Sequence, residues 1–188
     1  MSTRGHSLVE LLVVVAIMMT TAAVAVPFFR PAFADAHLLA AGQEFCSTFR
    51  LAASMAARRN VYTAIRFERD GDQVRYAVYC DGDHDGVLAD DIARGRDKLV
   101  AGPFPLGTGP TVRVGIRPET PAIPPERGLL SGDPIRFGNS DSISFSPLGT
   151  ATPGTLYLMG DGAQAAVRVT GGTARVRIMI WRGTWKER

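Results

Sequence analysis

The feature that most constrains the fold of this chain is an apolar run close to its N-terminus. The sixteen residues Leu11–Val26 carry no charge, and only two threonines interrupt their apolar character. Counted from His6 to Pro27, the segment is about 22 residues long, and a helix needs about 20 residues to cross the hydrocarbon core of a bilayer. We therefore expect a transmembrane helix over residues 6–28, ahead of a domain that folds in water.

Three kinds of segment share this composition. A secretory signal peptide would use Arg4 as its positive region and Ala23-Val24-Ala25 as its cleavage site. The others are an ordinary membrane anchor and a leader that is cut before the apolar run. Glu10 separates them, because a carboxylate is costly in lipid and the first two have no use for one. A capping box that begins at Ser7 explains helix initiation, but not an acid within the apolar run.

The third interpretation gives Glu10 a partner. If a peptidase cuts after Gly5, His6 becomes the new N-terminus, and Glu10 becomes the fifth residue of the shortened chain. Burying an amine and a carboxylate as a pair costs less than burying either alone. Between packed subunits such a pair would also set the axial register, so this stretch favours a subunit of a helical assembly.

The residues around the proposed cut resemble a known motif. Gly5 followed by HSLVELLVV is similar to the prepilin motif of type IV pilins and type II secretion pseudopilins, with His6 where that family usually has phenylalanine. The resemblance implies a leader at residues 1–5, cleavage by a prepilin peptidase between Gly5 and His6, and N-methylation of His6. It also implies that Glu10 and Pro27 serve filament assembly.

The apolar run continues into a second helical segment. Pro27 and Pro31 predict a bend at the membrane exit, because a proline removes a backbone hydrogen bond and kinks a helix. Apolar residues then recur at helical spacing up to Asn60, which predicts an amphipathic half over residues 29–60. Its expected apolar face consists of Leu38, Phe45, Phe49, Ala52 and Ala56.

After Asn60 the apolar period changes to two, which predicts strands. The expected strands are 61–68, 74–80, 111–117, 142–146, 155–159, 164–170 and 173–181. The Pro- and Gly-rich stretch from Gly102 to Pro125 predicts a long surface loop with at most a short strand. The expected fold class is α+β and pilin-like: a long bent N-terminal helix whose amphipathic half packs on an antiparallel sheet in a β-rich domain at 61–188.

The chain more widely resembles the GspH/FimT group of minor pseudopilins and minor pilins. The likeness is strongest over residues 5–67 and returns at FSPLGTATPGTLYL and VRVTGGTARVRI, although the group's Thr-Gly-Arg turn is Thr170-Gly171-Gly172-Thr173 here. It implies a structural subunit of a type II secretion pseudopilus, active in protein secretion, or of a type IV pilus. The implied location is the inner membrane, single-pass, with a periplasmic C-terminal domain.

The resemblance implies three kinds of partner: other pilin or pseudopilin subunits, the prepilin peptidase and an inner-membrane assembly platform. An enzyme is not expected, since the sequence has no GxSxG, no GxxxxGK[ST] phosphate loop and no HExxH. The net charge of +3 is too small to imply nucleic-acid binding by itself.

One stretch, CDGDHDGVLADD, has the residue types of a cation site. Its acids are Asp81, Asp83, Asp85, Asp90 and Asp91. The first three alternate as in an EF-type calcium loop, but the twelfth position of such a loop is Ile92 here. Two interpretations stay open: a solvated hairpin tip, or calcium binding at a loop that is not an EF-hand, which the use of calcium by some pseudopilins supports. No other cofactor is expected.

Basic residues gather near the C-terminus, with two tryptophans close by. They are Arg175, Arg177, Arg182 and Lys186. Arginines and aromatic rings on an exposed strand can hold DNA phosphates and stack on bases. Because some minor pilins of the resembling group bind DNA in natural transformation, a DNA-binding minor pilin is the alternative function. The other interpretation is an amphipathic edge strand whose charges prevent aggregation.

The two cysteines, Cys46 and Cys80, are too few for a disulfide framework. A single Cys46–Cys80 disulfide would require an oxidising compartment such as the periplasm. Otherwise, Cys46 is expected to be a small buried residue on the helix.

Overall fold

The computed structural model describes residues 7–71, 73–106, 112–138 and 140–188. Its dominant element is α1, Leu8–Arg59, a single helix of 52 residues. Ser7 caps its start, where the side-chain oxygen accepts a hydrogen bond from the Val9 N–H at 3.3 Å. Asn60 ends it in the left-handed conformation, with φ of 55°, which asparagine tolerates better than most residues. The prediction of one long helix is confirmed.

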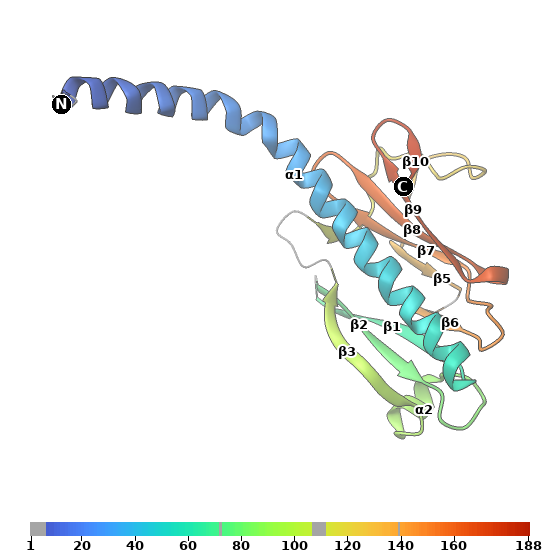
Figure 1. The fold of residues 1–188 in the computed structure, drawn as a ribbon. Helices are drawn as coiled ribbons and strands as arrows, with labels where there is room; N and C mark the ends of the chain where they lie inside the picture. The colour runs from blue at the N-terminus through green and yellow to red at the C-terminus, as the bar shows by residue number, and fades with distance from the viewer. Residues whose placement is uncertain (1–6, 72, 107–111, 139) are drawn as a thin grey trace.

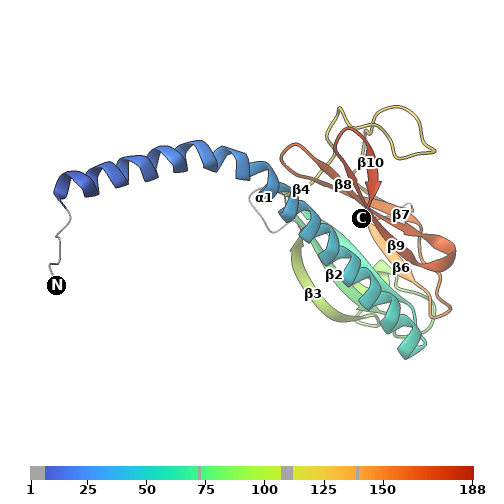
Figure 2. The same cartoon turned by 45° about the horizontal axis from the view of Figure 1, so that its top comes forward.

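The N-terminal half of α1 projects away from the rest of the chain, and the helix curves before it reaches the domain (Figures 1 and 2). Pro27 and Pro31 lie in α1 between the exposed Leu8–Ala25 and the first buried residue, Ala34. Each lacks the N–H that an unbroken ladder needs, which accounts for the bend. Beyond it, α1 lies across two sheets.

The domain contains two antiparallel sheets, where the sequence predicted one. The first has the order β3-β2-β1-β6, and the second has the order β10-β9-β8-β7-β4, with β5 also paired to β7. The first sheet is made of β1 (Thr63–Asp70), β2 (Gln73–Cys80), β3 (Lys98–Leu106) and β6 (Ser142–Phe145). The second is made of β4 (Arg113–Val114), β5 (Ile135–Phe137), β7 (Gly154–Met159), β8 (Gln164–Thr170), β9 (Arg175–Trp181) and β10 (Trp185–Glu187). Two short helical segments, α2 (Ala89–Ala93) and η1 (Gly171–Thr173), lie in connections.

Aromatic side chains of α1 bind the two sheets together. Phe49 is fully buried and contacts Phe137 of β5 edge-to-face, with ring centroids 5.9 Å apart. It also contacts Phe145 of β6, at 6.2 Å. Phe45 packs edge-to-face on Tyr76 of β2, at 5.5 Å. Buried aromatic rings contribute much of the stability of a core, so α1 joins the two sheets through the side chains that it packs against both.

The prediction of a surface loop from Gly102 to Pro125 is wrong in part. Its first residues belong to β3, and Val112 and Ile123 are buried. The segment is held down by Gln164, whose Oε1 accepts from the Arg117 N–H at 2.8 Å and whose Nε2 donates to the Gly115 carbonyl at 2.9 Å. Of the strand expected at 111–117, the described residues 112–117 form only the short β4.

Candidate functional site: an apolar span, an acidic loop and a basic groove

The apolar part of α1 that the structure describes, Leu8–Ala25, is exposed. None of the residues Leu8–Ala25 is buried, and the span is long and apolar enough to cross a membrane. Its two hydroxyls are satisfied inside the helix, because Thr20 donates to the Ala16 carbonyl at 2.9 Å and Thr21 to that of Ile17 at 2.8 Å. The threonines therefore present no unmet hydrogen-bonding need to lipid. Glu10 lies in the first turn, while Gly5 and His6 fall outside the described residues.

The other half of the same helix has a buried face. All five residues expected on it are buried, each at most 2% exposed: Leu38, Phe45, Phe49, Ala52 and Ala56. Gly42 lies on the same side, where an added Cβ would be 3.4 Å from Ile178 of β9. This is an ordinary van der Waals distance, so the helix packs directly against the Ile178 side chain of β9.

The acidic stretch forms a loop after β2 that two buried carboxylates hold in shape. Asp81 accepts hydrogen bonds from the backbone N–H groups of Asp83 at 3.1 Å, His84 at 2.7 Å and Gly86 at 3.0 Å. Such local bonds from an aspartate to the following backbone define a tight turn. The first role of Asp81 is therefore structural.

Asp97 supplies the second carboxylate, which the sequence did not single out. It is 3% exposed, and it accepts from the N–H of Gly82 at 3.1 Å and of Leu88 at 2.9 Å. The pattern of alternating acids ended well before residue 97. No local signal could have found it, since its role depends on the loop folding back.

The five acids do not form one group. The carboxylates of Asp81, Asp83 and Asp85 offer oxygens that all lie within 4.8 Å of one another. Asp91 is instead buried and forms an ion pair with Arg96, which also reaches Asp83 at 3.4 Å. Asp90 lies exposed in the first turn of α2. Three carboxylates could thus contribute to a calcium site, and the two interpretations from the sequence, a solvated hairpin tip or calcium binding, both stay open.

The crowding of these acids shifts one ionisation. A hydrogen bond with Asp83 raises the pKa of the exposed Asp85 carboxyl, with smaller contributions from desolvation and from the charges of Asp83, Asp91 and Asp81. The shift favours the protonated form, because two neighbouring carboxylates repel each other when both are ionised.

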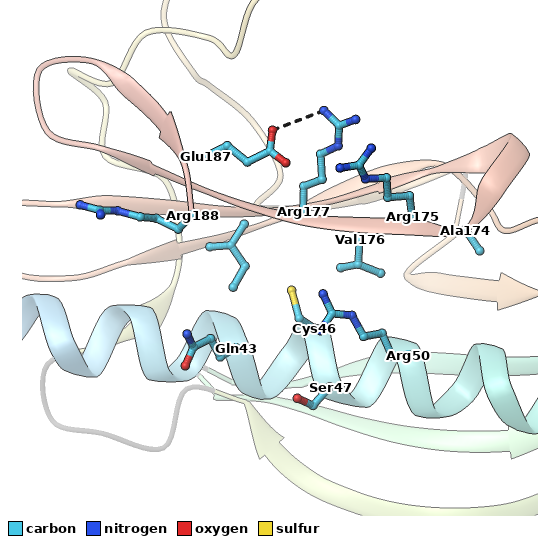
Figure 3. A pocket seen from close by; sticks show the side chains of 11 residues that line it. Gln43, Cys46, Ser47, Arg50, Ala174, Arg175, Val176, Arg177, Glu187 and Arg188 are labelled. Carbon is cyan, nitrogen blue, oxygen red and sulfur yellow. Dashed lines mark hydrogen bonds and ion pairs between the residues drawn. The ribbon is translucent and has the colours of Figure 1, made fainter.

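The four basic residues of the C-terminal strands lie in two separate places. Arg182 pairs with Asp35 of α1, and together with Lys186 they line a hollow of about 340 Å³. Arg175 and Arg177 line a larger open groove of about 620 Å³ between α1 and β9. Its lining residues are Gln43, Cys46, Ser47, Arg50, Ala174, Arg175, Val176, Arg177, Ile178, Glu187 and Arg188 (Figure 3).

Two of these four cations are already partnered by carboxylates. Arg177 donates to Glu187 of β10 at 3.4 Å, and Arg182 is the partner of Asp35. The sequence missed Arg50, which joins Arg175 at the groove from the helix side, because the helical pattern placed it only on a solvent-facing side. The C-terminal strands thus offer a long polyanion fewer unpaired positive charges than the sequence suggested. Arg50 and Arg175, unpaired among the described residues, are gathered at one groove.

The structure does not bring Cys46 and Cys80 together, and both are free, buried thiols. The Cys80 Sγ lies 3.5 Å from the Thr63 hydroxyl and 3.6 Å from Arg59 at the end of α1. Cys46 lies thirteen residues before Arg59, about 20 Å along a helix that rises 1.5 Å per residue. Burial raises the pKa of the Cys46 thiol, against the opposing charge of Arg50.

One long helix thus begins with a segment apolar enough to cross a membrane and continues as the helix that packs on an antiparallel β domain. This arrangement defines a pilin-like α+β protein. The chain belongs to the GspH family of type II transport proteins, whose family model matches residues 41–174. Comparisons with curated proteins and with solved structures give no significant match. The family match confirms the resemblance to minor pseudopilins and implies a structural subunit of a type II secretion system. It begins after the apolar span, so the motif around Gly5 and Glu10 lies outside it.

Proposed function

We propose that this protein is a minor pseudopilin that a prepilin peptidase cuts after Gly5 and that joins a type II secretion pseudopilus. The family membership supports the secretion branch rather than a type IV pilus. The observation that carries the proposal is the contrast within α1, whose first eighteen described residues are wholly exposed while its later turns form the core. A surface this apolar requires lipid or protein around it.

The span serves two environments in turn. At 1.5 Å per residue its eighteen residues extend about 27 Å, close to the thickness of the bilayer's hydrocarbon core. In the inner membrane it anchors the subunit, with the β domain on the periplasmic side. In the pseudopilus it packs against the equivalent helices of neighbours, where Glu10 lies near the amine of a neighbouring His6 and sets the register.

The N-terminal residue of the protein isolated from its host membrane tests this proposal. Intact mass and N-terminal fragment spectra should show a chain that begins at His6 and carries a methyl group. A chain that begins at Val26 would indicate ordinary signal-peptide cleavage, and one that keeps residues 1–5 would indicate a plain anchor. Either result would defeat the filament function.

A further inference from the structure

The strand β9 has a partner along only part of one edge. On one side it pairs with β8 over its full length, from Arg175 to Trp181. On the other side, among the described residues, β10 pairs with Met179–Trp181 alone, and one further bond runs from the Arg188 N–H to the Ile178 carbonyl at 3.0 Å. The first part of β9, Arg175–Arg177, therefore presents an open sheet edge, which is a template for another strand.

The backbone of Val176 faces this opening. Along a strand in an antiparallel sheet, residues two apart direct their N–H and C=O groups to the same side. Since the Ile178 carbonyl is directed to β10, the N–H and C=O of Val176 are directed past the end of β10, into the groove between β9 and α1. The groove thus offers one backbone donor and one backbone acceptor on its strand wall.

Guanidinium groups surround this edge on both sides. Arg50 rises from α1 toward the strand, while the side chains of Arg175 and Arg177 extend on the face of β9 that points away from the helix (Figure 3). Glu187 is the only side-chain carboxylate in the lining, and it is occupied with Arg177. Among the described residues, Arg50 and Arg175 have no ion-pair partner, so the groove carries excess positive charge.

We propose that this open edge of β9 receives a short, extended, acidic segment of a neighbouring pseudopilus subunit, which pairs with Val176. Addition of a strand to a sheet edge obtains affinity from main-chain hydrogen bonds and specificity from alternate side chains. Side chains of the added strand that face α1 meet Arg50, and those on the opposite face meet Arg175 and Arg177. The identity of the partner as a filament subunit rests on the proposed function.

The chemistry favours a peptide over the other occupants. The phosphodiester backbone of DNA carries only acceptors, so it offers the Val176 carbonyl no hydrogen-bond donor. A second copy that paired through the same edge of β9 would place Arg175 and Arg177 opposite arginines, and like charges across a strand pair are destabilising. An acidic strand can pair with the N–H and C=O of Val176 and can also neutralise the arginines of the groove.

The test is a binding titration on the full chain in detergent micelles. The probe is a blocked peptide, Thr-Glu-Glu-Thr-Glu-Glu-Thr, whose adjacent glutamates point to opposite faces of a strand. Its glutamine counterpart is the neutral control. Binding is followed together with hydrogen exchange at the Val176 amide, which we expect the acidic peptide to slow by about tenfold or more through formation of a backbone hydrogen bond.

Charge reversal identifies the groove. The double variant R50E/R175E should weaken peptide binding by about tenfold or more, because it removes two charge-assisted contacts. The matched control is the double variant R113E/R127E, and R127E alone serves as a further control. They change exposed arginines outside the groove lining and should leave the affinity unchanged. Both arginines replaced in the test variant are exposed, so it should keep the wild-type unfolding temperature within a few degrees.

Four outcomes would overturn the proposal. The first is that the wild-type protein does not bind the acidic peptide, and the second is that the peptide binds but leaves amide exchange at Val176 unchanged. The third is that a DNA duplex, and not the peptide, slows this exchange. The fourth is that self-association of the protein slows it without any peptide. The assay uses the isolated chain, so it is independent of filament incorporation. If the peptide binds as expected but the N-terminal mass contradicts processing after Gly5, the proposed function fails while the binding surface stands.

Discussion

The two halves of α1 share one backbone and have opposite surroundings. Leu8–Ala25 is exposed on every side, whereas beyond Ala34 the helix buries an aromatic and aliphatic face against both sheets. The difference shows that helix formation and the burial of apolar surface are separate requirements. The second half completes its burial within the chain, while the first half needs lipid or other subunits to do so.

The largest effect expected from the exposed half concerns assembly. Replacement of Glu10 with alanine should abolish incorporation into the pseudopilus and leave the thermal unfolding of the β domain unchanged, because no part of Leu8–Ala25 is buried in the domain. Incorporation is measured by fractionation of sheared filaments, and folding by circular dichroism. E10D keeps the charge and should retain part of the incorporation. Normal assembly of E10A would show that the prepilin motif has been misread.

The largest effect on stability is expected from the buried half. F49A should lower the free energy of unfolding by about 3–5 kcal/mol, the usual cost of removing a buried phenylalanine ring. Phe49 is fully buried between the two sheets. L12A, an apolar truncation in the exposed half, is the control and should change domain stability by less than about 0.5 kcal/mol. Urea unfolding in detergent compares them, and equal losses would contradict the division of α1.

A smaller effect is expected in the acidic loop. D97A removes the buried carboxylate that accepts from two backbone N–H groups and should cost about 1–3 kcal/mol, the usual range for the loss of a hydrogen bond to a charged group. Hydrogen exchange at Gly82 and Leu88 should accelerate, while exchange in the core of α1 should change only through global unfolding. D90A, which changes an exposed acid in the first turn of the neighbouring helix α2, is the control. Unchanged exchange in D97A would remove the structural role assigned to Asp97.

The smallest effect is pH-dependent. Because the pKa of Asp85 is raised, the folded state holds its proton more tightly than the unfolded chain, and stability falls as pH rises from the ordinary value of 3.8 through the raised one. D85N should therefore raise the unfolding temperature slightly at neutral pH and leave it unchanged in acid. Scanning calorimetry at both pH values measures this. A lower unfolding temperature of D85N at neutral pH would reverse the assignment.

The same loop allows a calcium measurement on the wild-type chain. Asp81 is occupied with backbone N–H groups, and Asp83 and Asp91 are held by Arg96. We therefore expect millimolar calcium to leave the unfolding temperature unchanged. A rise that D85N abolishes would establish the cation site instead.

The sequence predicted the long elements well because their periodicity is strong. The apolar run, the spacing from Leu38 to Ala56 and the cap at Asn60 define α1, and period-two patterns located most strands. It missed β3, whose Pro103 and Pro105 suggested a loop. A strand at the edge of a sheet tolerates proline where the missing N–H would face outward, and β3 is such an edge.

The groove and the acidic loop were less predictable, for a different reason. β5 and β10 have three residues each, too few to show a period, and β10 determines where the open edge of β9 begins. Arg50 and Arg175 are 125 positions apart in the sequence and meet only through tertiary packing. Asp97 likewise acquires its role when the loop closes. Local pattern contains no information on such contacts.

The continuity of α1 also has a mechanical consequence. A pull on the N-terminal turns travels along one continuous helix into the rings of Phe45 and Phe49, which belong to the buried core of the domain. The load therefore enters the fold in its buried core. Extraction from the bilayer would move the domain as one body, and the direction of force can change where α1 curves before it reaches the domain (Figure 1).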